Sequence, residues 1–299
     1  MKKVFHFMTG MIVTALLVSG TASIQAPVAS AAAASAQAKP TDYQDHPNRN
    51  EIDYVIKNKL MWLYPDGSFK PDQPITQADL IAGLANAKGL TDGIVVPNFP
   101  LNHWAKAYYE RALKDGILDE VVVDPNKVLN REEASLLLVN AWKGLYKRYQ
   151  TKNSTHSYTA VASGWLPEKS GQFINGVSTT AYDGLGVVSR GEEAQALFQL
   201  HKAVNDIKVG ESIATQFHNS LKVSGGILKG QVPSNKGKSA SLVILFKNNE
   251  TAEYRSGNFQ INVDKVKYME FTVKNSDESR SLAWYKYEKM PNTIRTNAR

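Results

Sequence analysis

Cysteine is absent from all 299 residues of the sequence. Its absence excludes thiol nucleophiles, disulfide bonds and cysteine-ligated metals. The six histidines lack the H-x-x-x-H and H-E-x-x-H spacings of metal sites, and no G-x-S-x-G elbow or phosphate-binding glycine loop occurs. Two adjacent acidic pairs remain, Glu132-Glu133 and Glu192-Glu193, but neighbouring residues of a helix point in different directions. We therefore expect a protein that is not an enzyme and uses no cofactor or metal.

Long apolar runs are also scarce. The hydrophobic segment at residues 11–18 is shorter than the roughly 20 residues that a membrane-spanning helix needs. It follows Lys2 and Lys3 and precedes a stretch of small residues, 26–38, that offers several A-x-A cleavage sites. We expect residues 1–38 to be a signal peptide with a small-residue linker that directs export, and a retained membrane anchor is the less favoured alternative.

Charge is unevenly distributed along the chain. Residues 39–205 hold 18 basic and 19 acidic side chains, whereas residues 206–299 hold 15 basic and 9 acidic ones. The net charge of +7 therefore comes mostly from the C-terminal third. An anionic partner is expected for such a segment, and in an exported protein this favours wall polymers or a membrane surface over nucleic acid.

An internal repeat organises the middle of the chain. Three strings recur at intervals of 54 and 59 residues, and each is followed by apolar residues at helical spacing. The strings are Ile75–Asp79, Leu129–Glu133 and Val188–Glu192. Each holds a good N-cap residue (Thr76, Asn130, Ser189) and an acid three residues later (Asp79, Glu133, Glu192), which is the pattern of a capping box. The strings therefore predict three helix starts.

The segments before these helix starts are also related. In the first copy, residues 52–60 have helical spacing and Pro65-Asp66-Gly67 is a turn signature. In the second copy, residues 108–117 have helical spacing, whereas the leading helix of the third copy has no clear place within residues 151–172. Each unit is thus expected to be a helix, a loop and a helix that must pack against its neighbours. The units are expected at residues 41–90, 98–146 and 160–203.

Residues 64–76, with the sequence Tyr-Pro-Asp-Gly-Ser-Phe-Lys-Pro-Asp-Gln-Pro-Ile-Thr, resemble the core signature of S-layer homology domains. The second copy adds His103-Trp104-Ala105 and Asn130–Glu133, and the third copy is degenerate. The resemblance implies three repeats with pseudo-threefold symmetry around a central helical bundle. It also implies binding to a secondary cell-wall polysaccharide, often through a pyruvate ketal, in grooves between repeats.

The resemblance further implies binding residues. An Arg commonly follows the N-cap in this family and contributes to ligand binding, and the matching positions here are Gln77, Arg131 and Arg190. An Arg in the first helical turn can offer two parallel donors to a carboxylate. Gln77 departs from the pattern and carries no charge. The alternative is that each Arg pairs with a neighbouring carboxylate on the surface.

Three tryptophans are candidates for stacking on sugar rings. They are Trp62, Trp104 and Trp165. A buried core position is the usual alternative for this residue type. We favour the core for Trp62, whereas both interpretations stay open for Trp104 and Trp165.

The C-terminal segment, residues 206–299, has strand-like patterns. An apolar run at 241–246 and alternation at 259–263 and 268–273 predict strands, and residues 221–232 predict a hairpin around Gly225-Gly226. Residues 284–287 are expected to close the sheet. Lys229 to Lys238 are interpreted as an exposed cationic loop and residues 291–299 as a mobile basic tail.

The predicted fold is therefore α+β and multidomain, with a pseudo-threefold helical repeat bundle followed by a small, mainly β domain. The expected function is non-catalytic anchoring to anionic, pyruvylated secondary cell-wall polysaccharide at the bacterial cell surface. The C-terminal module would be displayed there or bind further anionic wall polymers. The alternative is a small extracellular enzyme or inhibitor in residues 206–299 that the repeats deliver.

Overall fold

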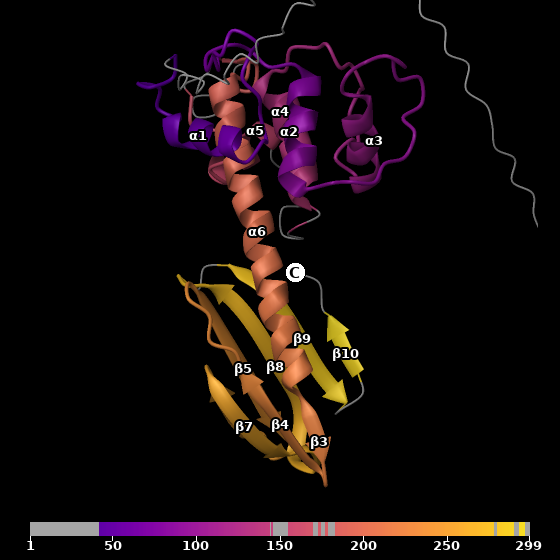
Figure 1. The fold of residues 1–299 in the computed structure, drawn as a ribbon, viewed down its shortest axis with the longest axis vertical. Helices are drawn as coiled ribbons and strands as arrows, with labels where there is room; N and C mark the ends of the chain where they lie inside the picture. The colour runs from indigo at the N-terminus through magenta and orange to yellow at the C-terminus, as the bar shows by residue number, and fades with distance from the viewer. Residues whose placement is uncertain are drawn as a thin grey trace, which may run out of the picture. The chain divides into compact units, whose positions relative to one another are not determined.

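The computed structural model describes residues 42–143, 145, 155–169, 173–174, 177–178, 183–277, 280–289 and 293–296, all within the compact unit Pro40–Arg299. The predicted signal segment lies outside the described residues. The helices are α1 (Arg49–Lys57), α2 (Gln77–Lys88), α3 (Lys106–Asp115), α4 (Arg131–Lys143), α5 (His156–Ala162) and α6 (Arg190–Ser220). The strands are β1 (Phe173–Ile174), β2 (Val177–Ser178), β3 (Lys222–Ser224), β4 (Ile227–Val232), β5 (Lys238–Phe246), β6 (Thr251–Tyr254), β7 (Gly257–Asn262), β8 (Val266–Asn275), β9 (Ser281–Lys289) and β10 (Thr293–Thr296). These elements agree with the expected α+β class (Figure 1).

The three predicted helix starts are confirmed. Thr76 and Ser189 each form a reciprocal capping box with the acid three residues later. Asn130 does the same, because its Oδ1 accepts from the Glu133 N–H at 2.8 Å and its own N–H donates to Glu133 Oε2 at 3.3 Å. The leading helix of the third copy, which the sequence did not locate, is α5. Each copy therefore contributes two helices, in the pairs α1 and α2, α3 and α4, and α5 and α6.

Backbone hydrogen bonds join the three helix starts in a closed ring. The Ile75 N–H donates to Val188 O at 3.0 Å, the Val188 N–H to Leu129 O at 3.2 Å, and the Leu129 N–H to Ile75 O at 3.1 Å. Two more closed sets of backbone hydrogen bonds follow, with donors two and three residues further along each copy. In the first set, the N–H groups of Gln77, Arg131 and Arg190 donate to the carbonyls of Lys127, Gly186 and Gln73, respectively. In the second set, the N–H groups of Ala78, Glu132 and Gly191 donate to the carbonyls of Pro125, Gly184 and Pro71. The first N–H groups of a helix have no partner within it, and here the loop of another copy supplies one.

The second helices of the copies, α2, α4 and α6, carry most of the buried helical residues. Helix α2 packs against both α4 and α6. A Cβ atom added to Gly83 of α2 would lie 2.4 Å from Leu197 Cδ1 of α6, so glycine permits the close approach of these two helices. The core therefore requires residues from all three copies.

Helix α6 runs through the expected domain boundary at residues 203–206. Its first half packs on α1 and α2, and its second half packs on β4, β8 and β9 (Figure 1). Gly210 lies against Leu282 of β9, and Phe217 stacks on Phe271 of β8 with 4.0 Å between the ring centroids. The C-terminal segment thus begins with helical residues, because the buried face of α6 continues at helical spacing past residue 206.

Strands β1 and β2 pair with each other, and the other strands form two antiparallel sheets with the orders β10-β9-β8-β5-β6 and β3-β4-β7. The predicted hairpin is confirmed, since β3 and β4 pair across Gly225 and Gly226, whose φ values are 55° and 75°.

The expected cationic loop is wrong in its bounds. Lys229 lies within β4, and Lys238 begins β5 and donates from Nζ to Asp206 Oδ1 at 2.7 Å. The expectation of a mobile tail is also wrong for β10, which pairs with β9.

Candidate functional site

The side chains that follow the three N-caps point into the molecule. Arg131 is 0% exposed; its Nη1 donates to Glu192 Oε1 at 2.6 Å and its Nη2 donates to Pro167 O. Burial lowers the pKa of the Arg131 guanidinium, and the charge of Glu192 opposes that shift. Arg131 therefore pairs with a carboxylate, as the alternative held, but the pair is buried and not on the surface, because Glu192 is buried as well.

Arg190 is also buried and engaged. Its Nε donates to Phe69 O at 2.8 Å and its Nη2 to Trp62 O at 2.7 Å. The guanidinium lies 4.7 Å from the ring centroid of Phe69 and 4.9 Å from that of Tyr64. Arg190 of the third copy thus holds the loop between α1 and α2 of the first copy.

Gln77 makes equivalent contacts from the first copy to the second. Its Nε2 donates to Val122 O at 2.9 Å, and its Oε1 accepts from the Tyr109 hydroxyl at 2.8 Å and from the Asp124 N–H at 2.9 Å. The three positions therefore share one geometry, in which each side chain reaches into the loop of the next copy. All three act as cross-links within the fold.

The division of the three tryptophans between core and surface differs from the expectation. Trp165 is 1% exposed and stacks on Trp142 at 4.8 Å, so its ring offers no face to a sugar. Trp62 is 48% exposed, and the core position favoured for it is wrong. The physical reason is that the preceding residues, Leu60 and Met61, fill the core at the end of α1. Trp104 is 55% exposed and remains available for stacking.

Trp62, Trp104 and Tyr108 form a surface group that we call the aromatic cluster. Trp62 comes from the loop after α1, Trp104 from the turn just before α3, and Tyr108 from the first turn of α3. The centroid of the Trp62 ring lies 6.5 Å from that of Trp104 and 6.2 Å from that of Tyr108, with edge-to-face geometry. His103 stacks on Trp104 at 5.8 Å. Two exposed indole rings therefore meet where the first and second copies join.

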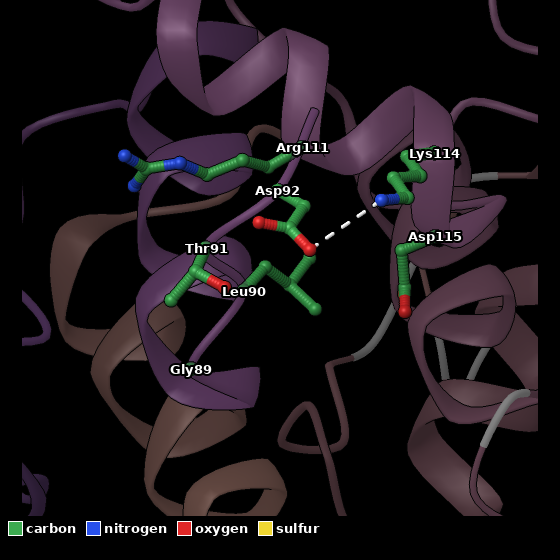
Figure 2. A pocket seen from close by; sticks show the side chains of 7 residues that line it. All are labelled: Gly89, Leu90, Thr91, Asp92, Arg111, Lys114 and Asp115. Atoms are coloured by element: carbon green, nitrogen blue, oxygen red, sulfur yellow. Dashed lines mark ion pairs between the residues drawn. The ribbon is translucent and has the colours of Figure 1, made fainter. Parts of the chain in front are cut away.

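A cation lies beside the aromatic cluster. The guanidinium of Arg111 is 5.4 Å from the ring centroid of Tyr108, and Arg111 also lines a pocket of about 310 Å³. The other lining residues are Gly89, Leu90, Thr91, Asp92, Lys114 and Asp115. Figure 2 shows that Lys114 points toward Asp92, with Nζ and Oδ2 3.5 Å apart, whereas the Arg111 guanidinium points away from Asp92. Within the described part of the chain, Arg111 forms no ion pair with a carboxylate.

Sequence reasoning missed two members of this site. Tyr108 lies four residues after Trp104, and Arg111 lies three residues after Tyr108 on the same face of α3. That spacing was visible in the sequence, but the residues were read only as part of a helix. Trp62 could not be placed beside them, because the sequence does not show which copies are neighbours at this point.

The acidic pairs Glu132-Glu133 and Glu192-Glu193 do not bring their carboxylates to one common site. Glu132 accepts hydrogen bonds from the His156 N–H at 2.8 Å and the Ser157 N–H at 2.9 Å, so it caps α5. Burial raises the pKa of Glu132, but the hydrogen bonds from Ser157 and His156 outweigh that effect and lower it. Glu193 lies in the core, and burial raises its pKa to about 8. No group of three or more potential metal ligands occurs among the residues that the structure covers.

Three helix–loop–helix units are thus closed into a ring, and an exposed aromatic cluster lies where the first two units meet. Residues 41–81 match the family model of the S-layer homology domain. The match covers α1, the turn at Pro65–Gly67 and the start of α2, and it indicates a cell-surface protein associated with the cell wall. A comparison with curated proteins gave no match. No described helix combines the length and the apolar character needed to cross a bilayer.

Proposed function

We propose that this chain is an exported, non-catalytic anchor whose three repeats bind a pyruvylated secondary cell-wall polysaccharide. The observation that carries the proposal is the aromatic cluster with Arg111 beside it. It lies where the first two copies meet, and the first copy is the one that matches the S-layer homology model.

The chemistry of the cluster suits such a ligand. Indole rings have apolar faces against which the C–H face of a sugar can pack. A pyruvate ketal adds a carboxylate to the sugar, and a guanidinium is a planar donor that pairs with a carboxylate through two hydrogen bonds. The contact of Arg111 with Tyr108 keeps this cation next to the rings.

Arg131, Arg190 and Gln77 have an indirect role in this proposal. Arg190 holds the backbone carbonyl of Trp62, and Gln77 holds the loop that precedes α4. We therefore assign these three to positioning the loops between copies. We assign the direct contacts with the polysaccharide to Trp62, Trp104 and Arg111.

The test is sedimentation of the purified protein with isolated cell-wall sacculi. Trp62→Ala combined with Trp104→Ala, and separately Arg111→Gln, should each lower the bound fraction at least tenfold, since each removes one class of contact. Leu101→Ala, at a side chain 82% exposed but outside the cluster, and Arg49→Gln are the matched controls. Each should bind like the unaltered protein.

Chemical removal of pyruvate from the sacculi tests the ligand itself. The unaltered protein should be released from the treated wall, and Arg111→Gln should then show no further loss. Full retention on the treated wall would contradict carboxylate recognition. Unchanged binding of the double tryptophan variant would contradict the site.

A further inference from the structure

The β3-β4-β7 sheet bears a second hollow, far along the chain from the aromatic cluster. It has a volume of about 540 Å³ and lies where the end of α6 meets the sheet. Its lining residues are Asn219, Ser220, Lys222, Lys229, Gly230, Gln231, Asn258, Phe259 and Gln260. None of them is acidic.

Two lysines of this hollow face each other. Lys222 of β3 and Lys229 of β4 are directly opposite in the antiparallel register, and both are exposed. Like charges in this position destabilise a strand pair. Neither lysine forms an ion pair with a carboxylate of any described residue. The pair is therefore a local concentration of positive charge that the fold itself leaves without a counter-charge.

Four carboxamides surround the lysines. Asn219 lies in the last turn of α6, Gln231 pairs across the strands with Asn258, and Gln260 pairs with Lys229. All four are exposed, and no described residue holds their side-chain amides by a hydrogen bond. A carboxamide offers both donors and acceptors, which matches the hydroxyl groups of a sugar.

The base of the hollow is a fixed framework. Gly230 has no side chain, and a Cβ atom there would lie 2.7 Å from the Phe259 ring, which fills that space from the neighbouring strand. Beyond Lys222 the edge of β4 has no strand partner, and the Ser220 hydroxyl accepts from the Gln231 N–H at 2.9 Å instead. The lysines and carboxamides thus project from paired strands whose register is set.

We propose that Lys222, Lys229 and the four carboxamides form a second binding site, specific for an anionic polysaccharide. The lysines provide the charge for carboxylate or phosphate groups, and the carboxamides bind the hydroxyls. This site uses only α6, β3, β4 and β7, so it does not rest on the aromatic cluster or on pyruvate recognition.

Affinity electrophoresis of the full chain tests the proposal. The gels contain polygalacturonate as a carboxylate polymer, dextran phosphate as a phosphate polymer or neutral dextran as the uncharged control. The protein should be retarded by at least one of the charged polymers and not by dextran, and the stronger of the two identifies the anionic group. The double variant Lys222→Gln/Lys229→Gln should weaken the retardation at least tenfold.

Two variants separate a site from general attraction between charges. Lys265→Gln/Lys267→Gln removes the same charge from exposed positions elsewhere in the module and should bind as before. Gln231→Ala/Asn258→Ala keeps the charge and should still weaken binding severalfold. Equal losses from both lysine pairs, or full competition by single-stranded DNA, would overturn the proposal. Because the aromatic-cluster variants should behave normally here, failure of this site is distinguishable from failure of wall anchoring.

Discussion

Glu193 is a carboxyl group enclosed by the helical core. A Cβ atom on Gly83 would lie 3.1 Å from its Oε1, and its Oε2 has no hydrogen-bond partner in the described structure. Burial raises the pKa of Glu193 to about 8, although the charge of Arg190 opposes the shift. The side chain is therefore protonated at neutral pH in the folded state, whereas it is ionised in the unfolded chain.

The sign of the resulting pH dependence follows from this difference. Between the unfolded pKa of 4.5 and the folded pKa of about 8, the folded state binds more protons than the unfolded state. The free energy of unfolding should therefore fall as pH rises across this window, by up to about 1.4 kcal/mol per pH unit. Glu193→Gln should flatten the slope, measured by urea unfolding at several pH values.

Glu132→Gln is the matched control for that prediction. The pKa of Glu132 is lowered in the fold, so its contribution is present above its unfolded pKa and lost as pH falls through the lower value. The two variants should thus change the pH profile in opposite directions. An unchanged slope in Glu193→Gln would contradict the role assigned to this group.

Among the elements, α6 is the one whose extent differs most from the sequence-based expectation. Its start was predictable from Ser189 and Glu192, since a capping box is a local pattern. Its end was not, because the change in composition near residue 206 suggested a boundary, whereas the buried face continues through Ile207 and Gly210. Burial against distant strands decided the helix length, and such contacts leave no local signal.

The same limit applies to the candidate site. Trp104 was identified from its residue type, but the burial of Arg131 and the exposure of Trp62 depend on which loops meet across the ring. Strands of the C-terminal segment were predictable from local patterns, β5 from its apolar run and β7 and β8 from alternation. Their order in two sheets was not, because β7 pairs with β4 and not with its neighbour β8.

Gly210 provides a test of α6 as an element. A Cβ atom there would lie 2.5 Å from Leu282 Cβ and 3.2 Å from the Leu282 carbonyl carbon, and backbone cannot easily move. Gly210→Ala should therefore lower the free energy of unfolding by about 1–3 kcal/mol through overpacking, despite the better helix propensity of alanine. Thermal or urea unfolding measures this change in the free energy of unfolding. Ser212→Ala, at an exposed position of the same helix, should change little.

A net stabilisation in Gly210→Ala would contradict the close contact between α6 and β9. It would mean that helix propensity, which favours alanine by about 1 kcal/mol, decides the outcome at this position.

On the scale of the whole molecule, the closed ring makes the three copies interdependent. The helix start of each copy donates its first N–H groups to the loop of another copy, and the side chains of Gln77, Arg131 and Arg190 follow the same order. No copy can satisfy these groups with its own residues. The three repeats should therefore be stable against unfolding only when they are together, and a single repeat should not be stable alone.

A fragment containing residues 41–90 alone tests this interdependence. We expect it to show little helical signal by circular dichroism and no cooperative unfolding, because its helix start and its buried face both lose their partners. Residues 41–299 should unfold cooperatively under the same conditions. A cooperative transition in the short fragment would contradict the prediction.

The continuity of α6 has a mechanical consequence. A cell surface is exposed to shear, and tension on the C-terminal strands would pass along one unbroken helix to its first turn. That turn is fastened to the first copy through Arg190 N–H to Gln73 O and Gly191 N–H to Pro71 O, and through the Arg190 guanidinium. The start of α6 is also held to the second copy by the Arg131–Glu192 pair. Such a load would therefore concentrate on the contacts of the third copy with the other two, and their strength sets the force at which they would open.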